Sequence, residues 1–369
     1  MKTKLIVIAM AMIALLLLSG CGQQATTATT AQKPSKAVVK IGITAPLTGP
    51  VAFLGEGMVN ALELAKEDLG ETKYEYKFIL EDDAMEPKKV STSTQKLINL
   101  DNVDAIVSAS SGSGNVVTPM AQEAKVIHFG IGSDANIAEG EYNHIHWTPP
   151  SEETKAWVAE AQKRGIKKIA ELYVNQQGAV AIIEQLKADL TPEMEVVFEE
   201  ATNFGDLDFK AVLMRAEKSE PDVLLVHYFS PEAEAVMKQI KELGIEIPIS
   251  SIESPELCDH PEVFEGAWYA NAADPTADFS GRYEARAGKN PPLASANTYD
   301  IIRFLVKGFE EAGADPAVKP SNEAVLAKLN GMELDGAMGH AKIDGGIVST
   351  KAVIRTIKDG KPVTLSGAQ

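Results

Sequence analysis

Residues 38–69, VVKIGITAPLTGPVAFLGEGMVNALELAKEDL, join a short β-rich run to a segment with helical periodicity. The run VVKIGIT at residues 38–44 is rich in Val and Ile, which predicts a buried strand. Apolar residues then recur at helical spacing over residues 55–69, and Gly70 follows as a stop signal. The stretch therefore predicts the first strand and helix of a parallel βαβ unit.

This strand–helix pair recurs along the chain in two series, which are separated by a break near residues 147–151. Strands that alternate with helices are typical of parallel sheets covered by helices on both faces. We therefore expect two doubly wound α/β lobes. The further strands are predicted at residues 76–80, 105–108 and 127–130 in the first series, and at 168–173, 195–198, 223–227 and 247–250 in the second.

The C-terminal part of the chain is expected to contribute helices and strands to both lobes. Residues 276–360 combine helical patterns with glycine-rich turns and a final β-rich run, so we expect the chain to return to the first lobe and then cross back. The predicted lobes are residues 37–149 plus 275–335 and residues 150–274 plus 336–369.

The N-terminus carries an export signal. Two lysines in the first four residues precede an unbroken apolar run at residues 5–18, and the sequence LSGC ends at Cys21. This arrangement predicts a signal peptide over residues 1–20. It resembles the lipobox of bacterial lipoproteins, which implies acylation of Cys21 and an extracytoplasmic protein anchored to the membrane. An uncleaved anchor, or a plain signal followed by a chance cysteine, is the alternative.

Composition narrows the class of protein. Residues 21–36 hold almost no large apolar side chains, which predicts a flexible tether. The net charge of −17 argues against a nucleic-acid partner and against a polybasic membrane face. Cys258 is the second of two cysteines, so acylation of Cys21 would leave it without a disulfide partner. We interpret Cys258 as a small buried residue and not as a catalytic thiol.

Neither metal binding nor catalysis has positive support in the sequence. His144 and His146 would share one strand face, but no acid or cysteine completes a set of metal ligands. No nucleophile, base and orienting group occur in order. We therefore expect no metal, no cofactor and no enzyme activity.

The loops after the predicted strands are the candidate binding site, because ligands of open parallel sheets bind beyond the carboxyl ends of the strands. The first series offers SASSGSG at residues 108–114 and GIGSD at 130–134, whose hydroxyls and backbone N–H groups suit a carboxylate. The second offers HYFSPE at residues 227–232 and SSIES at 250–254, which supply an aromatic wall and the carboxylate of Glu253.

Each of these loops also has a purely structural interpretation. The two serine- and glycine-rich loops could be plain helix caps. Phe229 could pack between the lobes, Glu253 could be solvated, and His227 could be a satisfied core histidine. The residue types alone leave these alternatives open.

One family combines these features. The opening strand and turn, KIGITAPLTGPVA at residues 40–52, resembles that of the branched-chain amino-acid-binding proteins, the type I periplasmic solute receptors of ABC importers. Further segments fall in the order of that family: residues 81–84 with Pro87 and Lys88, Ser110-Ser111, residues 130–134 and Tyr299-Asp300. The resemblance runs from residue 38 to the C-terminus and implies two lobes, joined by three hinge crossings, that close on a ligand.

The resemblance also implies roles for single residues. Ser111, with the backbone of Gly132 and Ser133, would hold the α-carboxylate of the ligand. Glu253 stands where the family places an acid that binds the α-ammonium. Phe229 occupies a position that is usually tyrosine.

Three departures from the family pattern bear on the ligand. Leu54 stands where an aromatic residue often closes the pocket, and Gly178, after Gln177, replaces an expected tyrosine. Leu54 and Gln177 remain among the predicted ligand-binding residues. Asp134 replaces a threonine hydroxyl and adds negative charge beside the carboxylate site. That charge favours a ligand with an extra donor or cationic group, such as a polar amino acid, an amide or a polyamine-like compound.

The functional hypothesis is a monomeric, lipid-anchored receptor that delivers an amino acid or a related small molecule to an ABC permease in the membrane. A ligand sensor on the same fold, which signals to a membrane partner, is the first alternative. An exported enzyme is the second.

Overall fold

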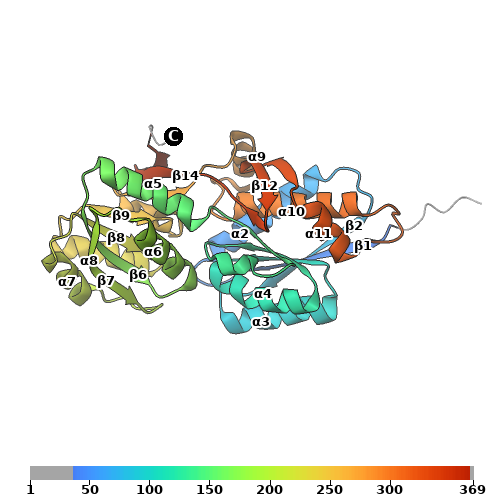
Figure 1. Ribbon diagram of the computed structural model, residues 1–369, viewed down its shortest axis with the longest axis horizontal. Coiled ribbons are helices and arrows are strands. Elements are labelled where there is room, and N and C mark those ends of the chain that lie inside the picture. Colours follow the sequence, from blue (N-terminus) through green and yellow to red (C-terminus); the bar gives the residue numbers. More distant parts are fainter. Residues whose placement is uncertain (1–35, 366–369) are drawn as a thin grey trace, which may run out of the picture. The chain divides into compact units, whose positions relative to one another are not determined.

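The computed structural model describes residues 36–365 of the 369-residue chain. The predicted signal peptide, Cys21 and all of the predicted tether except Lys36 lie outside the described residues. The described part forms two β-sheets with helices on both faces of each (Figure 1), which confirms the predicted two-lobe α/β class. Within residues 36–365, no helix combines the length and the apolar character that crossing a bilayer requires.

The first lobe is built on an eight-stranded sheet with the order β11-β12-β13-β5-β4-β3-β1-β2. Neighbours from β13 to β2 run parallel, whereas β11, β12 and β13 pair antiparallel with one another. The strand order reverses between β1 and β3, so the loops after these two strands diverge and leave room for a ligand. The strands are β1 (Val38–Ala45), β2 (Glu75–Asp82), β3 (Ala105–Ala109), β4 (Ile127–Ile131), β5 (Asn143–His146), β11 (Glu333–Gly336), β12 (Gly339–Asp344) and β13 (Ile347–Val348).

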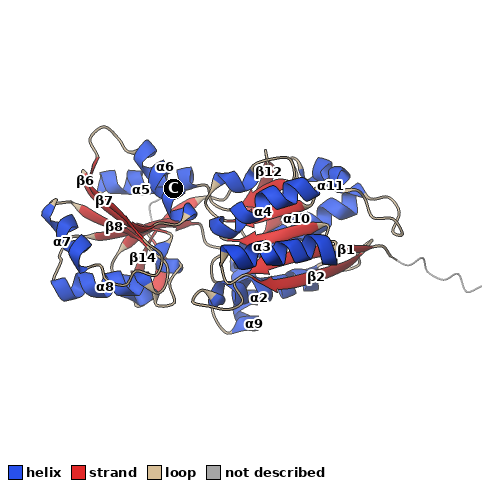
Figure 2. Ribbon diagram, turned by 90° about the horizontal axis from the view of Figure 1, so that it is seen from below, coloured by secondary structure: helices blue, strands red, loops and turns tan. Residues whose placement is uncertain are grey.

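Helices cover both faces of this sheet because its central strands are apolar on both sides. Ile41 and Ile43 of β1 pack into a core with one group of helices, and Ile106 of β3 packs into a second core on the other face. Figure 2 shows the second group, α3 and α4, lying side by side along the sheet. The first group comprises α2 (Ala52–Asp68), α9 (Ala277–Ala287), α10 (Ser295–Ala312) and α11 (Asn322–Leu329), and the second comprises α3 (Pro87–Lys96) and α4 (Ser111–Ala124).

The second lobe is built on a seven-stranded sheet with the order β15-β14-β10-β9-β8-β6-β7. The strands from β7 to β10 run parallel, and β14 and β15 add an antiparallel edge. Ile169 and Ala170, adjacent in β6, face two separate cores on opposite sides of the sheet. The strands are β6 (Lys168–Val174), β7 (Glu195–Thr202), β8 (Val223–His227), β9 (Ile249–Ile252), β10 (Trp268–Ala272), β14 (Ala352–Lys358) and β15 (Lys361–Thr364).

Four helices cover this second sheet. The two cores bury α5 and α6 against one face and α7 and α8 against the other. Their bounds are α5 (Pro150–Lys163), α6 (Gln177–Asp189), α7 (Lys210–Lys218) and α8 (Glu232–Leu243).

The chain crosses between the lobes three times, as predicted, at residues 147–149, 273–276 and 349–351. Hydrogen bonds join the crossings to one another. The hydroxyls of Thr148 and Thr350 share one, and the backbone N–H of Ala273 donates to the carbonyl of Lys351 at 2.7 Å. The three segments therefore form one connected hinge.

The third crossing lies further along the chain than the sequence predicted. Residues 336–369 were assigned to the second lobe, but β12 and β13 belong to the first sheet, where Ile347 pairs with Ile145 of β5. These strands are short and separated by glycines, so they lack the apolar run that marks a strand in the sequence. Only β14 and β15 return to the second lobe.

Glu171 of β6 is a buried acid in the second lobe, away from the loops at the strand ends. Its side chain faces α5 and α6 together with Ile169, and neither carboxylate oxygen has a hydrogen-bond partner among the described residues. Burial, reinforced by the charge of Glu199, raises the pKa of Glu171 to about 8. The folded protein therefore holds this proton at a pH where the unfolded chain has lost it.

The unfolding free energy of the Glu171→Gln variant is expected to increase relative to that of the native protein as the pH rises. The folded-state pKa lies above the unfolded value, so Glu171 reduces stability progressively between about pH 4.5 and 8, and Gln does not titrate. The difference in unfolding free energy should shift in favour of the variant by about 3 kcal/mol between pH 5 and pH 8. Urea unfolding at both values measures it, and an equal difference at the two would contradict the assignment.

Candidate functional site

A cavity of about 510 Å³ lies at the carboxyl ends of the central strands of both sheets and is lined by residues of both lobes. Apolar side chains form most of its wall, and no Lys or Arg lines it among the described residues. Seven of the eight predicted ligand-binding residues meet in this wall: Leu54, Ser111, Gly132, Ser133, Gln177, Phe229 and Glu253.

On the first lobe, hydrogen bonds to Ser111, the first residue of α4, join the loop after β3 to the loop after β4. The Oγ of Ser111 accepts hydrogen bonds from the backbone N–H groups of Ser133 at 3.0 Å and Asp134 at 3.1 Å. Ser110, before it, caps α4 with its side chain and has a φ of 78°, a conformation that L residues rarely adopt. Gly132 lets the loops approach, because a Cβ there would lie 2.6 Å from the backbone nitrogen of Ser111.

Asp134 does not line the cavity with the other predicted ligand-binding residues, although its backbone N–H lies 3.1 Å from Ser111 Oγ. Its Oδ2 accepts a hydrogen bond from the Asn115 side chain at 2.6 Å, and its Oδ1 accepts one from the backbone N–H of Asn136 at 3.0 Å. The acid therefore caps the short 3₁₀ turn Ala135–Ala138. The sequence shows the order of these residues but not the direction of the side chain.

On the second lobe, α6 points its N-terminus at that of α4. Gln176 caps α6 by accepting a hydrogen bond from the backbone N–H of Gly178 at 2.8 Å. A Cβ on Gly178 would lie 2.9 Å from Ser111 Oγ of the other lobe, and one on Gly112 would lie 3.3 Å from Gln177 Oε1. Glycine at position 178, where the family resemblance led us to expect tyrosine, is thus required by the close approach of the two helix ends.

Glu253 connects the two lobes and the hinge. It follows β9 with a φ of 59°, and only 4% of its surface is exposed. Its Oε1 accepts hydrogen bonds from Ser133 Oγ of the first lobe at 2.9 Å and from Trp147 Nε1 of the first crossing at 2.7 Å. Burial raises the pKa of Glu253, and these donors oppose the shift by stabilising its charged form.

A second acid, Glu153 in the first turn of α5, lies beside Glu253 and was not predicted. Its side chain is fully buried, and no described N–H or O–H group donates to either oxygen. Burial and the neighbouring charge of Glu253 raise the pKa of Glu153 well above its usual range. An acid in the first turn of a helix suits the helix dipole, so nothing in the sequence around Glu153 indicates a buried site.

His227 and Phe229 complete the second-lobe wall, with ring centroids 5.9 Å apart. His227 is fully buried, and neither ring nitrogen makes a hydrogen bond with another described residue. Burial lowers the pKa of His227 to about 4, and the nearby carbonyl of Ile252 opposes the shift, so the ring is neutral at pH 7. Of the two interpretations of His227, the structure therefore favours the one in which it lines the cavity.

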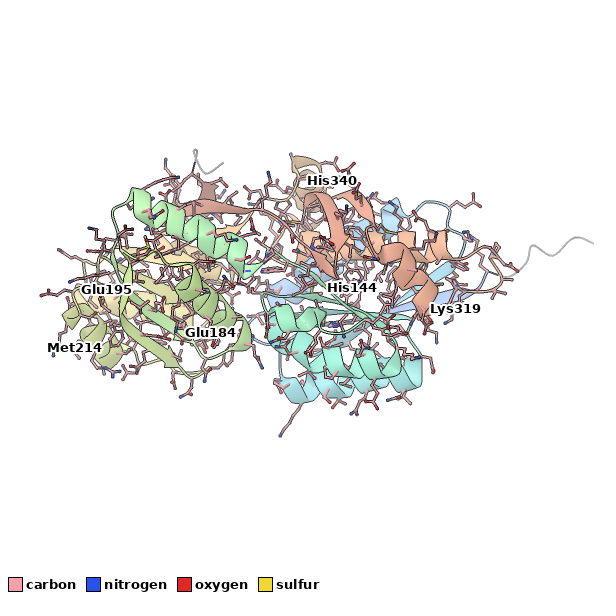
Figure 3. All side chains as sticks on the ribbon, viewed as in Figure 1. His144, Glu184, Glu195, Met214, Lys319 and His340 are labelled. Atoms are coloured by element: carbon pink, nitrogen blue, oxygen red, sulfur yellow. The ribbon has the colours of Figure 1, made fainter. Side chains whose placement is uncertain are left out.

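The arrangement supports binding and not metal chemistry. Within residues 36–365, no group of three or more His, Cys, Asp or Glu residues is placed to hold a metal ion. His144, inside the first lobe (Figure 3), stacks on Phe129 with centroids 4.6 Å apart, and His146 contacts Asn297. The Cys258 thiol is buried and donates to the carbonyl of Ser254, and burial raises its pKa well above the usual range, which keeps it protonated.

A second cavity, of about 580 Å³, shares Trp147, Leu293 and Ala294 with the first but contains none of the predicted ligand-binding residues. The arginine in its wall, Arg355, is already paired with acids: its Nη1 donates to both oxygens of Glu256 at 2.9 and 3.0 Å. Arg355 Nη2 also pairs with Asp274 at 2.6 Å. This cavity therefore has a weaker claim to a charged ligand.

Comparison with known proteins gives consistent matches. A sequence model of the family described as periplasmic binding protein matches residues 38–361. The Leu/Ile/Val-binding protein BraC3 of Rhizobium johnstonii is 26% identical over 324 residues, covering 82% of this chain and 86% of that protein. A leucine-, isoleucine-, valine-, threonine-, and alanine-binding protein of Pseudomonas aeruginosa is 25% identical over 303 residues, covering 75% and 80%.

Solved structures share the fold. The leucine binding protein LivK of Thermotoga maritima superposes with a TM-score of 0.79 at 22% identity, covering 89% of this chain and 98% of that one. A solute binding protein of an ABC transporter from Rhodopseudomonas palustris, in complex with 3,4-dihydroxybenzoic acid, gives 0.76 at 22% identity, covering 89% and 96%. The sequence and structure matches together confirm the resemblance drawn from residues 40–52.

Gly132→Ala is expected to destabilise the first lobe. The new Cβ must move the backbone of Ser111 and strain its two hydrogen bonds with the neighbouring loop. Overpacking of this kind lowers the unfolding free energy by about 1–3 kcal/mol, which urea denaturation measures. Gly281→Ala is the control, since nothing lies within 4 Å of its Cβ position. Equal stability of Gly132→Ala and the native protein would contradict the close approach.

Proposed function

Because the chain belongs to the periplasmic binding protein family, we propose that it is an extracytoplasmic receptor for an amino acid or a related amine-bearing molecule. It hands this ligand to an ABC importer in the membrane. The proposal rests on the burial of the acid Glu253 in the cavity wall. No Lys or Arg among the described residues lines this cavity. A positive group on the ligand would supply the missing charge.

The loop next to Glu253 suits the carboxylate of an amino acid, whose carboxylate and ammonium group share one carbon. Ser111 stands at the N-terminus of α4; its Oγ accepts hydrogen bonds from the backbone N–H groups of Ser133 and Asp134, which leaves its O–H to donate to a ligand carboxylate. Backbone donors at the positive end of a helix favour an anion. A cavity of about 510 Å³ with an apolar wall and few polar groups has the usual character of a small-molecule site.

Ligand binding in this proposal is coupled to closure of the lobes. Glu253 on the second lobe already contacts Ser133 on the first and Trp147 on the hinge, so a head group bound at Glu253 touches all three parts. Only the differential contacts of the ligand with the closed form can shift the equilibrium toward it. Leu54, Gln177 and Phe229 would then enclose the rest of the ligand.

Glu253→Ala is expected to weaken binding of an ammonium-bearing ligand by ~2–5 kcal/mol, as for a buried charge left without its partner. Isothermal titration against a panel of amino acids, amines and aromatic carboxylates identifies a ligand and measures the loss. Glu171→Gln, a buried acid outside the cavity, is the control. Unchanged affinity in Glu253→Ala would place Glu253 outside the site, and no binding across the panel would count against the receptor itself.

The anchor belongs to the same proposal. Cys21 carries acyl chains, and residues 21–36 tether a monomeric receptor close to its permease, so that effective concentration stands in for tight docking. Its support is the sequence of residues 1–21.

Cys21→Ser is expected to move the protein from the membrane fraction to the soluble extracytoplasmic fraction, because the residue that carries the acyl chains is lost. Fractionation with metabolic labelling by a fatty acid measures this. Cys258→Ser, which changes the buried thiol, is the control. Label retained in the Cys21→Ser protein would contradict acylation at Cys21.

A further inference from the structure

Two buried carboxyl groups meet at one end of the cavity, on separate elements of the second lobe. Glu253 follows β9 and lines the cavity, and Glu153 lies behind it in the first turn of α5. Oε1 of Glu253 is held by Ser133 and Trp147, whereas no described N–H or O–H group donates to either oxygen of Glu153. Glu153 is within hydrogen-bond reach of Glu253, so its carboxyl group can be satisfied only by keeping a proton and donating it to Glu253.

The charged groups around the pair do not neutralise it. Glu256, on the 3₁₀ turn Ser254–Glu256, adds a further negative charge that acts on both acids. Arg355 of β14 is the nearby cation, but it is committed to Glu256 and Asp274. Tyr269 of β10 also donates to Glu256.

The remaining neighbours of α5 leave the pair without a cation as well. On α6, Lys187 pairs with Glu199, Asp189 accepts from Thr154, and Glu184 is exposed (Figure 3). His227 of β8 is neutral. On α5 itself, the side chains of Glu152 and Lys155 are exposed.

Two adjacent carboxyl groups in a site of low dielectric do not both ionise, so one of them keeps a proton. The donors to Oε1 favour the charge on Glu253, which leaves the proton on Glu153. Positive charge placed at Glu253 would remove the reason for keeping that proton, because it offsets the repulsion between the two carboxylates.

We propose that Glu153 is a second acid of the head-group site and that it exchanges its proton for the positive charge of the bound ligand. This rests on the proposed function, since it takes Glu253 as the residue that binds the ammonium group. The exchange is balanced: R–NH₃⁺ enters beside Glu253, the Glu153 carboxylic acid becomes a carboxylate, and H⁺ leaves to the solvent. Glu153 acts through Glu253 and is therefore a positioning residue.

The exchange defines the class of ligand. A head group with a full positive charge is accepted, and a ligand that carries only a carboxylate, such as 4-hydroxybenzoate, is rejected because it would meet two acids. Affinity for the cationic ligand rises with pH as the proton is released, by up to about tenfold per pH unit for one proton. Below the pH at which Glu253 ionises, the site is neutral and binding is weak.

The test uses the full chain and four probes, L-leucine, L-threonine, L-glutamine and L-arginine, with 4-hydroxybenzoate as the anionic probe. Isothermal titration in phosphate and in Tris at pH 7.5 gives the number of protons released per ligand bound, because the two buffers differ in ionisation enthalpy. Titrations from pH 6.0 to 8.5 give the pH profile of the affinity. The native protein, Glu153→Gln and Glu171→Gln are compared.

Proton release is expected from the native protein and from Glu171→Gln with any amino acid that binds, together with affinity that rises with pH. Glu153→Gln keeps a neutral donor behind Glu253 but has no proton to give, so its release and its pH dependence should disappear. A native protein that binds without proton release would overturn the proposal, whether or not the variant folds. Equal proton release from Glu153→Gln would also overturn it, as would binding of 4-hydroxybenzoate as tight as that of the amino acid.

Failure of the proposed function has a different signature. If none of the four amino acids binds the native protein, or if binding survives unchanged in the Glu253→Ala variant described above, the ammonium site itself is refuted and the proton exchange falls with it. Binding that depends on Glu253 but releases no proton refutes the exchange alone.

Discussion

The carboxylate of Glu253 is the interaction on which the site depends. Its Oε1 accepts two hydrogen bonds, one from Ser133 of the first lobe and one from Trp147 of the hinge. The backbone of Glu253 continues from β9 of the second lobe. Its positive φ is a strained conformation that persists only where the surroundings require it. Removing the acid would therefore disturb the lobe contact, the hinge and the cavity wall together, and in the proposed function it is this residue that links ligand binding to lobe closure.

The electrostatics around this residue distinguish the cavity from a general apolar pocket. Two buried acids lie at one end of the cavity, and no Lys or Arg lines its wall within residues 36–365. Their negative charge is therefore neutralised either by a bound proton or by a positively charged ligand. Next to them, Ser133 connects Glu253 to Ser111 at the N-terminus of α4, where negative charge is favoured. This arrangement fits the head group of a zwitterionic amino acid, whose two charged groups share one carbon. The same fold holds an aromatic acid in a structural neighbour from Rhodopseudomonas palustris, so the architecture alone does not determine the ligand.

The sequence predicted most of the fold because many of its strands are rich in β-branched and apolar residues, such as residues 38–44 and 223–227, with helical spacing between them. It did not predict β10, β11, β12, β13 or β15, of which β12 and β13 are short and flanked by glycines. Seven of the eight candidate site residues meet in one cavity because strand ends of a parallel sheet share an edge. The direction of the Asp134 side chain and the burial of Glu153 were missed for one reason: neighbours in sequence do not reveal which way a side chain turns or what buries it.

The central claim is that a cationic head group binds at Glu253, and a structure of the protein purified with its native ligand tests it most directly. We expect a ligand nitrogen within hydrogen-bond distance of the Glu253 carboxylate and the ligand's carboxylate against Ser111 and the loop of Gly132 and Ser133. A ligand whose negatively charged group faces Glu253, or one seated in the cavity beside Arg355, would contradict it.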